Sequence, residues 1–546
     1  MFRTLLIVAL AMWCSGSSSA QNRPNVLLIC IDDLKPQIGC YGDKLAITPN
    51  IDRLASRGTL FRAAYCNQAV CSPSRNALLT SLRPQTLGIY DLPTHFRKAK
   101  PDAITLPQHF KSHGYTTQGL GKIFHVGHGN IDDAQSWSVP SWRPGGPAYA
   151  LQASTEETKT KANGKDKGNA TESADVPDET YADGKVAAEA IRRLDQLQHD
   201  TAPFFLAVGF VKPHLPFVAP KKYWDQYDPN QIPLPMVSSP PLGAPAFAPT
   251  NSGELWAYAD MPSKGPLPES RIRHLLHGYF AATSYTDAQI GKVLSYLDKS
   301  GLSKNTLVVL WGDHGWHLGD HGMWCKHTNY EQATRIPLIV SLPGQSRAAT
   351  TSAMVESVDV FPTLSELAGL PTPTSLDGRS FASTLKQSDA KARDYITHVY
   401  PRGQILGRAI RDSRYRMVEW KEPGSSPDSA EIELYDYQSD PLETTNLASK
   451  HPDIVQRMRK ILATHPEAKP QLKTTDDKQE EKPAKKQDRN AMFEKRDQDK
   501  DGFLTRQEFL INQPDPDQAP DRFLKFDQNK DGKLSLEEFV KSGSNK

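Results

Sequence analysis

The segment Asn25-Val-Leu-Leu-Ile-Cys-Ile31 is a compact apolar run that ends in two acidic residues, Asp32 and Asp33. An unbroken apolar run of this length predicts a strand that is buried on both faces. Three similar runs follow along the chain, at residues 203–210, 306–311 and 336–340. Helical patterns alternate with these runs, at residues 179–197 and 271–297. This alternation predicts an α/β domain in which helices cover both faces of a mostly parallel sheet.

Acidic and imidazole side chains follow two of the predicted strands. Asp32 and Asp33 come after the first, and Asp313 and His314 come after the run at 306–311. In open α/β sheets, ligands bind beyond the carboxyl ends of the strands. One such Asp pair is more often a turn or a helix cap, but two at equivalent strand ends favour a shared site. Three carboxylates and one imidazole suit a hard divalent cation such as Ca²⁺.

The segment Cys71-Ser-Pro-Ser-Arg75 predicts the start of a helix. Pro73 suits the first helical position, where its missing N–H is not needed. Cys71 is then expected at the positive end of the helix, beside the guanidinium of Arg75. Anionic chemistry is favoured at such a position.

Three basic clusters follow predicted strands and are expected to converge on one anion site. They are Lys122 with His125, Lys212 with His214, and Lys326 with His327. A single exposed Lys or His is usually only solvated, but three clusters after strands favour a common role. Cations placed in this way hold an anion and stabilise charge that develops during group transfer.

The bulk properties exclude some classes of protein. The chain has 546 residues and a net charge of +2, which gives no electrostatic case for a nucleic-acid partner. Residues 1–20 have the basic start, apolar stretch and small-residue end of an export signal. No later segment is apolar enough for a stable membrane span. We therefore expect an exported protein, periplasmic or secreted.

Composition divides the remainder of the chain into four parts. We expect a catalytic domain at residues 21–393 and a smaller α+β subdomain at 394–464, where short β patterns precede a helix. Residues 465–490 are rich in Lys, Glu, Asp, Gln and Pro, which predicts a charged linker. Residues 491–546 carry two helix–loop–helix patterns, which predict a separate helical module.

These two patterns fit the twelve-residue EF-hand loop, with Asp or Asn at positions 1, 3 and 5, Gly at 6 and Glu at 12. Position 7 contributes a backbone carbonyl. One match in a charged tail could be chance, but two in tandem predict a pair of Ca²⁺ sites. The expected ligands are Asp497, Asp499, Asp501, Phe503 and Glu508 in the first loop, and Asp527, Asn529, Asp531, Lys533 and Glu538 in the second.

The order of these motifs resembles type I sulfatases of the alkaline-phosphatase superfamily, over residues 22–465. The motifs are Asp-Asp at 32–33, CSPSR at 71–75, GKIFH at 121–125, KPHLPF at 212–217 and DHGWHLGDHGMWCKH at 313–327. The details resemble the iduronate-2-sulfatase branch, including His314 where many other sulfatases have Asn. Ser81 departs from the glycine that usually follows the CSPSR helix, which bears on backbone geometry there.

The resemblance implies that a formylglycine-forming enzyme oxidises Cys71 to formylglycine, whose hydrate attacks sulfur. It also implies an active-site Ca²⁺ that polarises the sulfate. The ligands of this ion would be Asp32, Asp33, Cys71, Asp313 and His314.

Further roles follow from the same resemblance. Lys122, Lys326 and Arg75 would hold the sulfate and the hydrate. His214 would protonate the leaving oxygen, and His125 would deprotonate the second hydroxyl to release sulfate. Trp316 would line the sugar pocket, although a loop tryptophan can equally be a packing residue. The implied substrate is a sulfated carbohydrate, with the 2-O-sulfate of a uronic acid or a related sugar in a polysaccharide as the first choice.

Three alternatives remain open at this point. The fold could serve a phosphate or phosphonate ester hydrolase. The large domain could instead be catalytically silent, with the EF-hand pair making the protein a calcium-dependent binding module. Cys71 could form a disulfide with Cys66 instead of being converted to formylglycine. Five cysteines follow the signal, and conversion of Cys71 to formylglycine would leave four, an even number.

Overall fold

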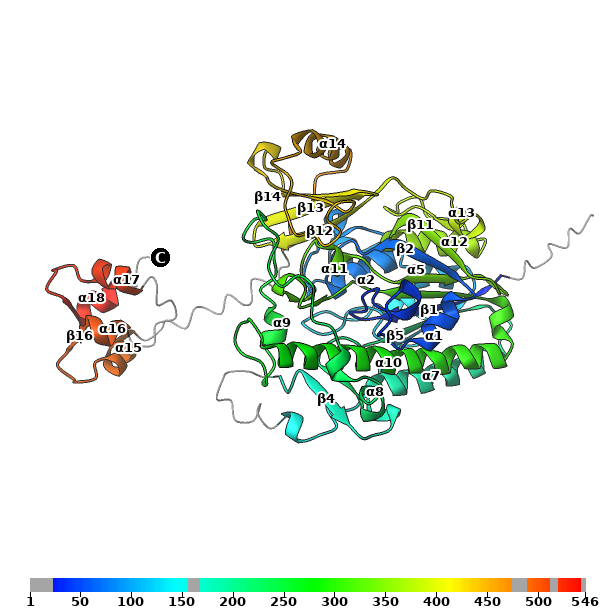
Figure 1. The fold of residues 1–546 in the computed structure, drawn as a ribbon, viewed down its shortest axis with the longest axis horizontal. Coiled ribbons are helices and arrows are strands. Elements are labelled where there is room, and N and C mark those ends of the chain that lie inside the picture. Colours follow the sequence, from blue (N-terminus) through cyan, green and yellow to red (C-terminus); the bar gives the residue numbers. More distant parts are fainter. Residues whose placement is uncertain (1–22, 156–166, 474–488, 511–518, 542–546) are drawn as a thin grey trace, which may run out of the picture. The chain divides into compact units, whose positions relative to one another are not determined.

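The computed structural model describes residues 23–155, 167–473, 489–510 and 519–541 (Figure 1). Residue contacts divide the chain into two compact units, residues 1–472 and 473–546. The predicted export signal, residues 1–20, lies outside the described residues. No helix in the described part of the chain is long and apolar enough to cross a membrane.

The first unit is built on a seven-stranded sheet with the order β11-β2-β10-β7-β1-β5-β3. Every neighbouring pair is parallel except those of β10, which runs antiparallel to both β2 and β7. The mostly parallel sheet predicted from the apolar runs is therefore confirmed. The strands are β1 (Asn25–Ile31), β2 (Thr59–Tyr65), β3 (Thr116–Gly121), β5 (Phe204–Phe210), β7 (Thr306–Gly312), β10 (Leu338–Ser341) and β11 (Ala349–Glu356).

Both faces of the sheet are buried because successive side chains of a strand point in opposite directions. In β1, Val26, Leu28 and Cys30 belong to one apolar core, whereas Leu27, Ile29 and Ile31 belong to another. The first core contains side chains from α2 (Cys71–Thr80), α5 (Leu106–Ser112) and α12 (Val360–Leu367). The second contains side chains from α1 (Pro49–Ala55), α7 (Ala182–Leu197) and α10 (Glu269–Lys299), and Figure 1 shows α10 running beside α7.

Shorter elements connect this framework. Two small sheets pair β4 with β6 and β8 with β9. The strands are β4 (Thr171–Ala174), β6 (Phe217–Pro220), β8 (His317–Leu318) and β9 (Trp324–Cys325). The short helices are α3 (Pro84–Leu87), α4 (Phe96–Ala99), α8 (Lys221–Trp224), α9 (Gly253–Trp256), α11 (Glu331–Thr334) and α13 (Ala382–Lys386).

An antiparallel sheet follows in the first unit, and α14 (Pro452–Leu462) packs on it through Met458 and Leu462. This is the α+β subdomain expected from the short β patterns. Its strands are β12 (Tyr395–Arg402), β13 (Ile405–Asp412), β14 (Tyr415–Lys421) and β15 (Glu431–Asp436).

The linker begins later than residue 465, where the sequence predicts it. Ala468 is buried against Tyr90, and Glu467 forms ion pairs with Arg408 at 2.9 Å and Lys421 at 2.8 Å. Residues 465–472 therefore belong to the first unit. Of the remainder of the predicted linker, residues 474–488 lie outside the described part of the chain.

The second unit is a pair of helix–loop–helix motifs around a core of phenylalanine and leucine side chains. The two loops pair through a short antiparallel ladder in which Leu504 faces Leu534. Its elements are α15 (Arg489–Arg496), β16 (Phe503–Thr505), α16 (Arg506–Leu510), α17 (Ala519–Phe526), β17 (Lys533–Ser535) and α18 (Leu536–Lys541).

Candidate active site

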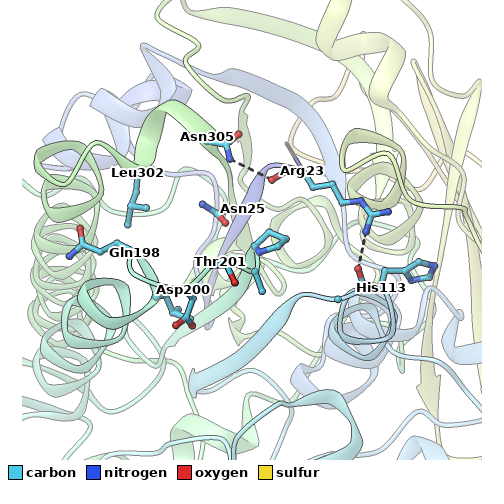
Figure 2. Close-up of a pocket in the computed structure, with 12 residues that line it drawn as sticks. Arg23, Asn25, His113, Gln198, Asp200, Thr201, Leu302 and Asn305 are labelled. Atoms are coloured by element: carbon cyan, nitrogen blue, oxygen red, sulfur yellow. Dashed lines mark hydrogen bonds between the residues drawn. The ribbon is translucent and has the colours of Figure 1, made fainter. Parts of the chain in front are cut away.

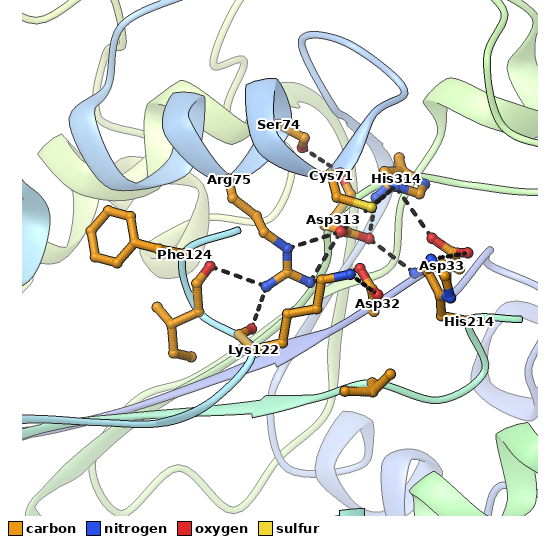
Figure 3. Close-up of polar contacts among 12 residues, drawn as sticks. Asp32, Asp33, Cys71, Ser74, Arg75, Lys122, Phe124, His214, Asp313 and His314 are labelled. Carbon is orange, nitrogen blue, oxygen red and sulfur yellow. Dashed lines mark hydrogen bonds and ion pairs between the residues drawn. The ribbon is translucent and has the colours of Figure 1, made fainter. Parts of the chain in front are cut away.

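The polar residues predicted to form one site converge at the carboxyl ends of the central strands (Figure 3). Asp32 and Asp33 follow β1, Lys122 follows β3, His214 lies after β5, and Asp313 follows β7. Because these strands are parallel neighbours, their carboxyl ends bring residues from distant parts of the chain to one edge.

Arg75 ties this edge together, and its side chain is fully buried. Its guanidinium lies 3.0 Å from Asp32 Oδ1 and donates through Nε to Asp313 Oδ2 at 3.1 Å. It also donates to the backbone carbonyl of Ile123 at 3.1 Å. A buried charge is tolerated only when it is paired and hydrogen-bonded, and Arg75 meets both conditions. Arg75 therefore fixes the relative positions of two carboxylates from different strands.

The four residues Asp32, Cys71, Asp313 and His314 each present a ligand atom within 4.8 Å of the others. His314 Nε2 lies 3.3 Å from Cys71 Sγ, 3.3 Å from Asp33 Oδ1 and 3.6 Å from Asp313 Oδ2. The predicted ligand set is thus one cluster, and all five side chains are buried.

The chemistry of this donor set fits a hard divalent cation. Burial, together with the nearby charge of Asp32, raises the pKa of Asp33 and of Asp313. A cation among these carboxylates would relieve that repulsion. Several carboxylate oxygens with a single imidazole match the preference of Ca²⁺ for oxygen ligands.

Cys71 is the first residue of α2, so the helix begins two residues before Pro73, which was expected at the first helical position. Pro73 is tolerated in this first turn because its N–H groups have no partner within the helix. Burial, followed by the charge of Asp32, raises the pKa of the Cys71 thiol to about 12. The thiol is therefore protonated at neutral pH and is a poor nucleophile in that form.

Two lysines surround the cluster. Lys122 Nζ contacts Asp32 Oδ2, and Lys326 Nζ lies 3.3 Å from both carboxylate oxygens of Asp33. Burial opposes ionisation of Asp32, but Lys122 and Arg75 hold its pKa well below the ordinary value. Both lysines are therefore charged partners of buried acids, placed where an incoming anion could share them.

The two histidines with predicted acid–base roles lie in different environments. Neither ring nitrogen of His125 has a hydrogen-bond partner among the described residues, although both are buried. Burial, with the charge of Lys122, lowers the pKa of His125 to about 3, so the ring is a neutral proton acceptor. His214 Nδ1 is hydrogen-bonded to the carbonyl of Leu215 at 2.5 Å, which turns Nε2 toward Asp33 at 3.9 Å.

Trp316 does not line a sugar pocket, contrary to the interpretation drawn from the resemblance. Its side chain has no exposed surface and packs edge-on against Phe217 at 6.3 Å between ring centroids. Lys326 Nζ lies 4.9 Å from the centre of its ring, and the ring of His214 lies 6.4 Å away. Trp316 therefore packs against two site residues, Lys326 and His214.

Glu254, on α9, is a charged member of the site that sequence reasoning missed. It lies 3.0 Å from Lys326 Nζ and 3.3 Å from His214 Nε2. Burial opposes its ionisation, but the charge of Lys326, followed by that of His214, holds the pKa of Glu254 well below its ordinary value. The surrounding proline-rich segment has no strand or helix period that could have placed this residue.

Ser81, the departure from the glycine expected after α2, adopts the left-handed conformation at φ 54°. A residue with a Cβ is disfavoured there. Its hydroxyl donates to the carbonyl of Val358 at 2.6 Å and accepts from the N–H of Gly378 at 3.2 Å. These bonds offset the backbone cost, so the serine preserves the turn.

The five cysteines in the described part of the chain are all free. This contradicts the alternative of a Cys66–Cys71 disulfide. It also leaves the Cys71 side chain available for modification.

A hollow at the opposite ends of the strands is separate from this site (Figure 2). It is lined by Asn25, where β1 begins, and by Arg23, which donates to the carbonyl of His113 at 2.8 Å. No member of the carboxylate cluster lines it. This hollow is therefore distinct from the candidate site at the carboxyl ends of the strands.

Both EF-hand loops have the expected turn geometry. Gly502 and Gly532, at position 6, have φ of 84° and 82°. In the first loop, Asp497 accepts from the N–H of Gly502 at 2.9 Å, and Glu508 folds back to accept from the N–H of Gln498 at 2.9 Å. Ligand atoms of Asp497, Asp499 and Asp501 lie within 4.8 Å of one another, which fits a Ca²⁺ site.

The second loop repeats this arrangement. Asp527 accepts from the N–H of Gly532 at 2.9 Å, and Asp531 accepts from the N–H of Lys533 at 2.9 Å. Glu538 accepts from the hydroxyl of Ser535 at 2.8 Å and from the N–H of Asn529 at 3.3 Å. The backbone carbonyls of Phe503 and Lys533 occupy position 7 of their loops.

Three family models and a curated relative match the sequence of this chain. The sulfatase family model matches residues 24–370, the N-sulphoglucosamine sulphohydrolase C-terminal model matches 319–468, and the EF-hand model matches 490–510 and 521–541. The iduronate 2-sulfatase of Mus musculus is 34% identical over 535 residues, covering 83% of this chain and 96% of the mouse protein.

Two solved structures share the fold. One is a complex of an enzyme with its substrate D-glucosamine-2-N,6-O-disulfate, at a TM-score of 0.65 and 24% identity, covering 81% of this chain and 97% of that one. The other is the phosphonate monoester hydrolase of Agrobacterium radiobacter, at a TM-score of 0.66 and 21% identity, covering 82% and 96%. At these identities the likeness concerns the fold alone.

The sulfatase model covers more than half of the chain, and the mouse relative is similar over almost its full length. These matches decide between the sulfatase and phosphoesterase readings that the shared fold leaves open. The chain belongs to the sulfatase family of the alkaline-phosphatase superfamily, as an iduronate-2-sulfatase-like sulfate ester hydrolase with an EF-hand pair.

Proposed function

We propose that this protein is an exported sulfatase, periplasmic or secreted, that hydrolyses sulfate esters of carbohydrates. The observation that carries the proposal is the position of Cys71. Its Sγ lies at the N-terminus of α2, 3.3 Å from His314 and within a cluster of buried carboxylates. Lys122, Lys326 and Arg75 place three cations around this cluster, which suits an anionic ester.

The nucleophile in this proposal is formylglycine made from Cys71 by a formylglycine-forming enzyme. The buried thiol is protonated at neutral pH, so it does not supply the anionic nucleophile itself. The hydrated aldehyde would supply a hydroxyl at the same position.

Asp32, Asp33, Asp313 and His314, with the modified Cys71, would hold Ca²⁺. When bound, this ion supplies Lewis-acid polarisation of the sulfate oxygens. Arg75 holds Asp32 and Asp313 in place through contacts to both carboxylates, which follow β1 and β7.

Four further residues have the remaining roles. Lys122 and Lys326 bind the sulfate oxygens and stabilise the charge that develops on them. His214 bonds the carbonyl of Leu215 through Nδ1, so Nε2 can give a proton to the leaving oxygen only when the ring is an imidazolium. Burial, followed by the charge of Lys326, lowers the pKa of His214, and the carboxylate of Glu254, 3.3 Å from Nε2, opposes this and favours the protonated ring. His125 has two unpartnered ring nitrogens, so it can accept the proton whose removal releases sulfate.

The substrate class follows from the relatives, because the mouse protein is named iduronate 2-sulfatase. We place the 2-O-sulfate of a uronic acid, or of a related sugar in a sulfated polysaccharide, first among the candidates. A panel of sulfated disaccharides that differ only in sulfate position tests this choice. Preferential release from the 2-O position is expected, and preference for an N-sulfate or 6-O-sulfate would contradict it.

Replacing His214 with alanine is expected to slow substrates with poor leaving groups more than activated ones. General acid catalysis contributes about 10²- to 10⁴-fold when the leaving oxygen needs a proton, and little when it does not. The measurement is kcat for a series of aryl sulfates whose phenols increase in pKa. Equal losses across the series would remove His214 from the acid role.

Truncation before Met492 is expected to leave hydrolysis of a small aryl sulfate unchanged. The two units are compact separately, and the EF-hand pair has its own core of buried phenylalanines. The measurement is kcat/KM of the truncated and full-length chains. A large loss in the truncated chain would assign the EF-hand pair a part in the activity of the first unit.

The EF-hand pair is proposed to bind two Ca²⁺ ions through the loop ligands named above. In the first loop the ligand atoms of Asp497, Asp499 and Asp501 converge, and in both loops a glutamate at position 12 folds back over the loop.

A further inference from the structure

Glu254 contacts His214 and Lys326, two residues of the candidate active site. Its side chain is 14% exposed, so it lies at the edge of the site rather than in the packed core. It faces two of the groups assigned above to substrate binding and proton transfer. One carboxylate oxygen lies 3.3 Å from His214 Nε2, and the other lies 3.0 Å from Lys326 Nζ.

Lys326 is shared between two acids, Asp33 and Glu254. Its Nζ lies 3.3 Å from Asp33 Oδ1 and Oδ2, and at a similar distance from the carboxylate of Glu254. Asp33 is a proposed metal ligand, so an ammonium drawn wholly onto it would compete with the cation. Glu254 offers Lys326 a second partner, and this keeps the ammonium between the cluster and the edge of the site.

His214 is held from both ends of its ring. Nδ1 is bonded to the carbonyl of Leu215, and Nε2 faces the carboxylate of Glu254. The ring of Trp316 lies beside that of His214, at 6.4 Å between centroids. The ring orientation of His214 is therefore fixed by the Leu215 carbonyl at Nδ1 and by the Glu254 carboxylate near Nε2.

We propose that Glu254 is a positioning residue that aligns His214 with the leaving oxygen and keeps Lys326 available to the sulfate. This inference rests on the proposed function, which assigns those two side chains their roles. It goes beyond the motifs, because Glu254 lies outside all of them. The carboxylate acts through its neighbours and takes no covalent part in the reaction.

The test compares Glu254→Gln with the wild-type chain on the aryl sulfate series used for His214. Glutamine keeps the shape of the side chain but removes its charge. We expect kcat to fall about tenfold to hundredfold for the poorest leaving group, and much less for the most activated one. Displacement of Lys326 is expected to raise KM for all members of the series alike.

The double variant His214→Ala/Glu254→Gln separates positioning from a general structural effect. If Glu254 acts through His214, the second substitution should not steepen the leaving-group dependence beyond that of His214→Ala alone. Glu172→Gln is the matched control. Glu172 is a buried carboxylate that accepts from the N–H of Ala150 at 2.7 Å and from the hydroxyl of Tyr181 at 2.7 Å. It is not one of the residues assigned to the candidate active site.

Three results would overturn the inference, and they can be told apart. If His214→Ala steepens the leaving-group dependence but Glu254→Gln lowers kcat equally across the series, the positioning role fails and the proposed function stands. If His214→Ala itself shows no steepening, the acid role of His214 fails, and the inference fails with it. A shift in melting temperature without any change in the leaving-group dependence would likewise leave Glu254 a purely structural residue.

Discussion

Replacing Cys71 with alanine is expected to abolish sulfate ester hydrolysis, with a loss in kcat on the order of 10⁴-fold or more. The reason is chemical, because alanine cannot be oxidised to an aldehyde and leaves no group to attack sulfur. The fold should survive, since Cys71 Sγ contacts a side chain, His314 Nε2 at 3.3 Å, and replacing the thiol with hydrogen opens only a small space. The measurements are kcat on an aryl sulfate and the melting temperature.

Cys66→Ala is the matched control for this variant. Cys66 is also buried and free, lies five residues earlier, and has only a weak 3.9 Å contact to the carbonyl of Ala333. We expect this variant to keep most of the activity. Retained sulfate release in Cys71→Ala would contradict the mechanism, and a loss of activity in both variants would point to packing rather than chemistry.

Replacing Asp313 with asparagine is expected to lower kcat/KM by about a thousandfold, through loss of the metal. Asparagine can still accept from the N–H groups of Asp33 and His314, both at 3.0 Å, so the local backbone should be retained. The negative charge that faces Arg75 and the proposed cation is lost. A Lewis acid supplies several kcal/mol to such a transition state, and each 1.4 kcal/mol is about tenfold in rate.

Calcium content gives a second readout for the same variant. The EF-hand sites are first silenced by Glu508→Gln and Glu538→Gln in the full chain. In that background Asp313→Asn should lose about one bound calcium ion per chain. Asp287→Asn is the control, because Asp287 is a buried acid that also accepts backbone N–H groups, from Ile51 at 2.7 Å. Unchanged calcium content in Asp313→Asn would contradict the proposed ligand set.

The sequence predicts the central sheet because its strands are continuous apolar runs that are buried on both faces. It also predicts the convergence of Asp32, Asp33, Asp313 and His314, since residues that follow parallel strands must meet at one edge. The direction of β10 was not predictable in the same way. A buried apolar run has the same pattern in either orientation, and only the pairing with β2 and β7 reveals it.

Other features depend on contacts that no local pattern encodes. Glu254 lies in a proline-rich segment without periodicity, and only its meeting with Lys326, 72 residues away, gives it significance. The same holds for residues 465–472 of the predicted linker. In the sequence Glu467 has the pattern of a solvated acid, and only the structure shows its ion pairs with Arg408 and Lys421. The motif placed Trp316 correctly near the site, but burial by Phe217 decides that it supports the site rather than lining it.

The proposed function depends on the conversion of Cys71 to formylglycine. The most direct measurement is the mass of the tryptic peptide Ala63–Arg75, from denatured protein made in a host that can form formylglycine. We expect a peptide that is lighter by the mass difference between a cysteine –CH₂SH side chain and an aldehyde –CHO side chain, with the change located at Cys71 and not at Cys66. A fully active protein whose peptide carries an unmodified Cys71 thiol would contradict it.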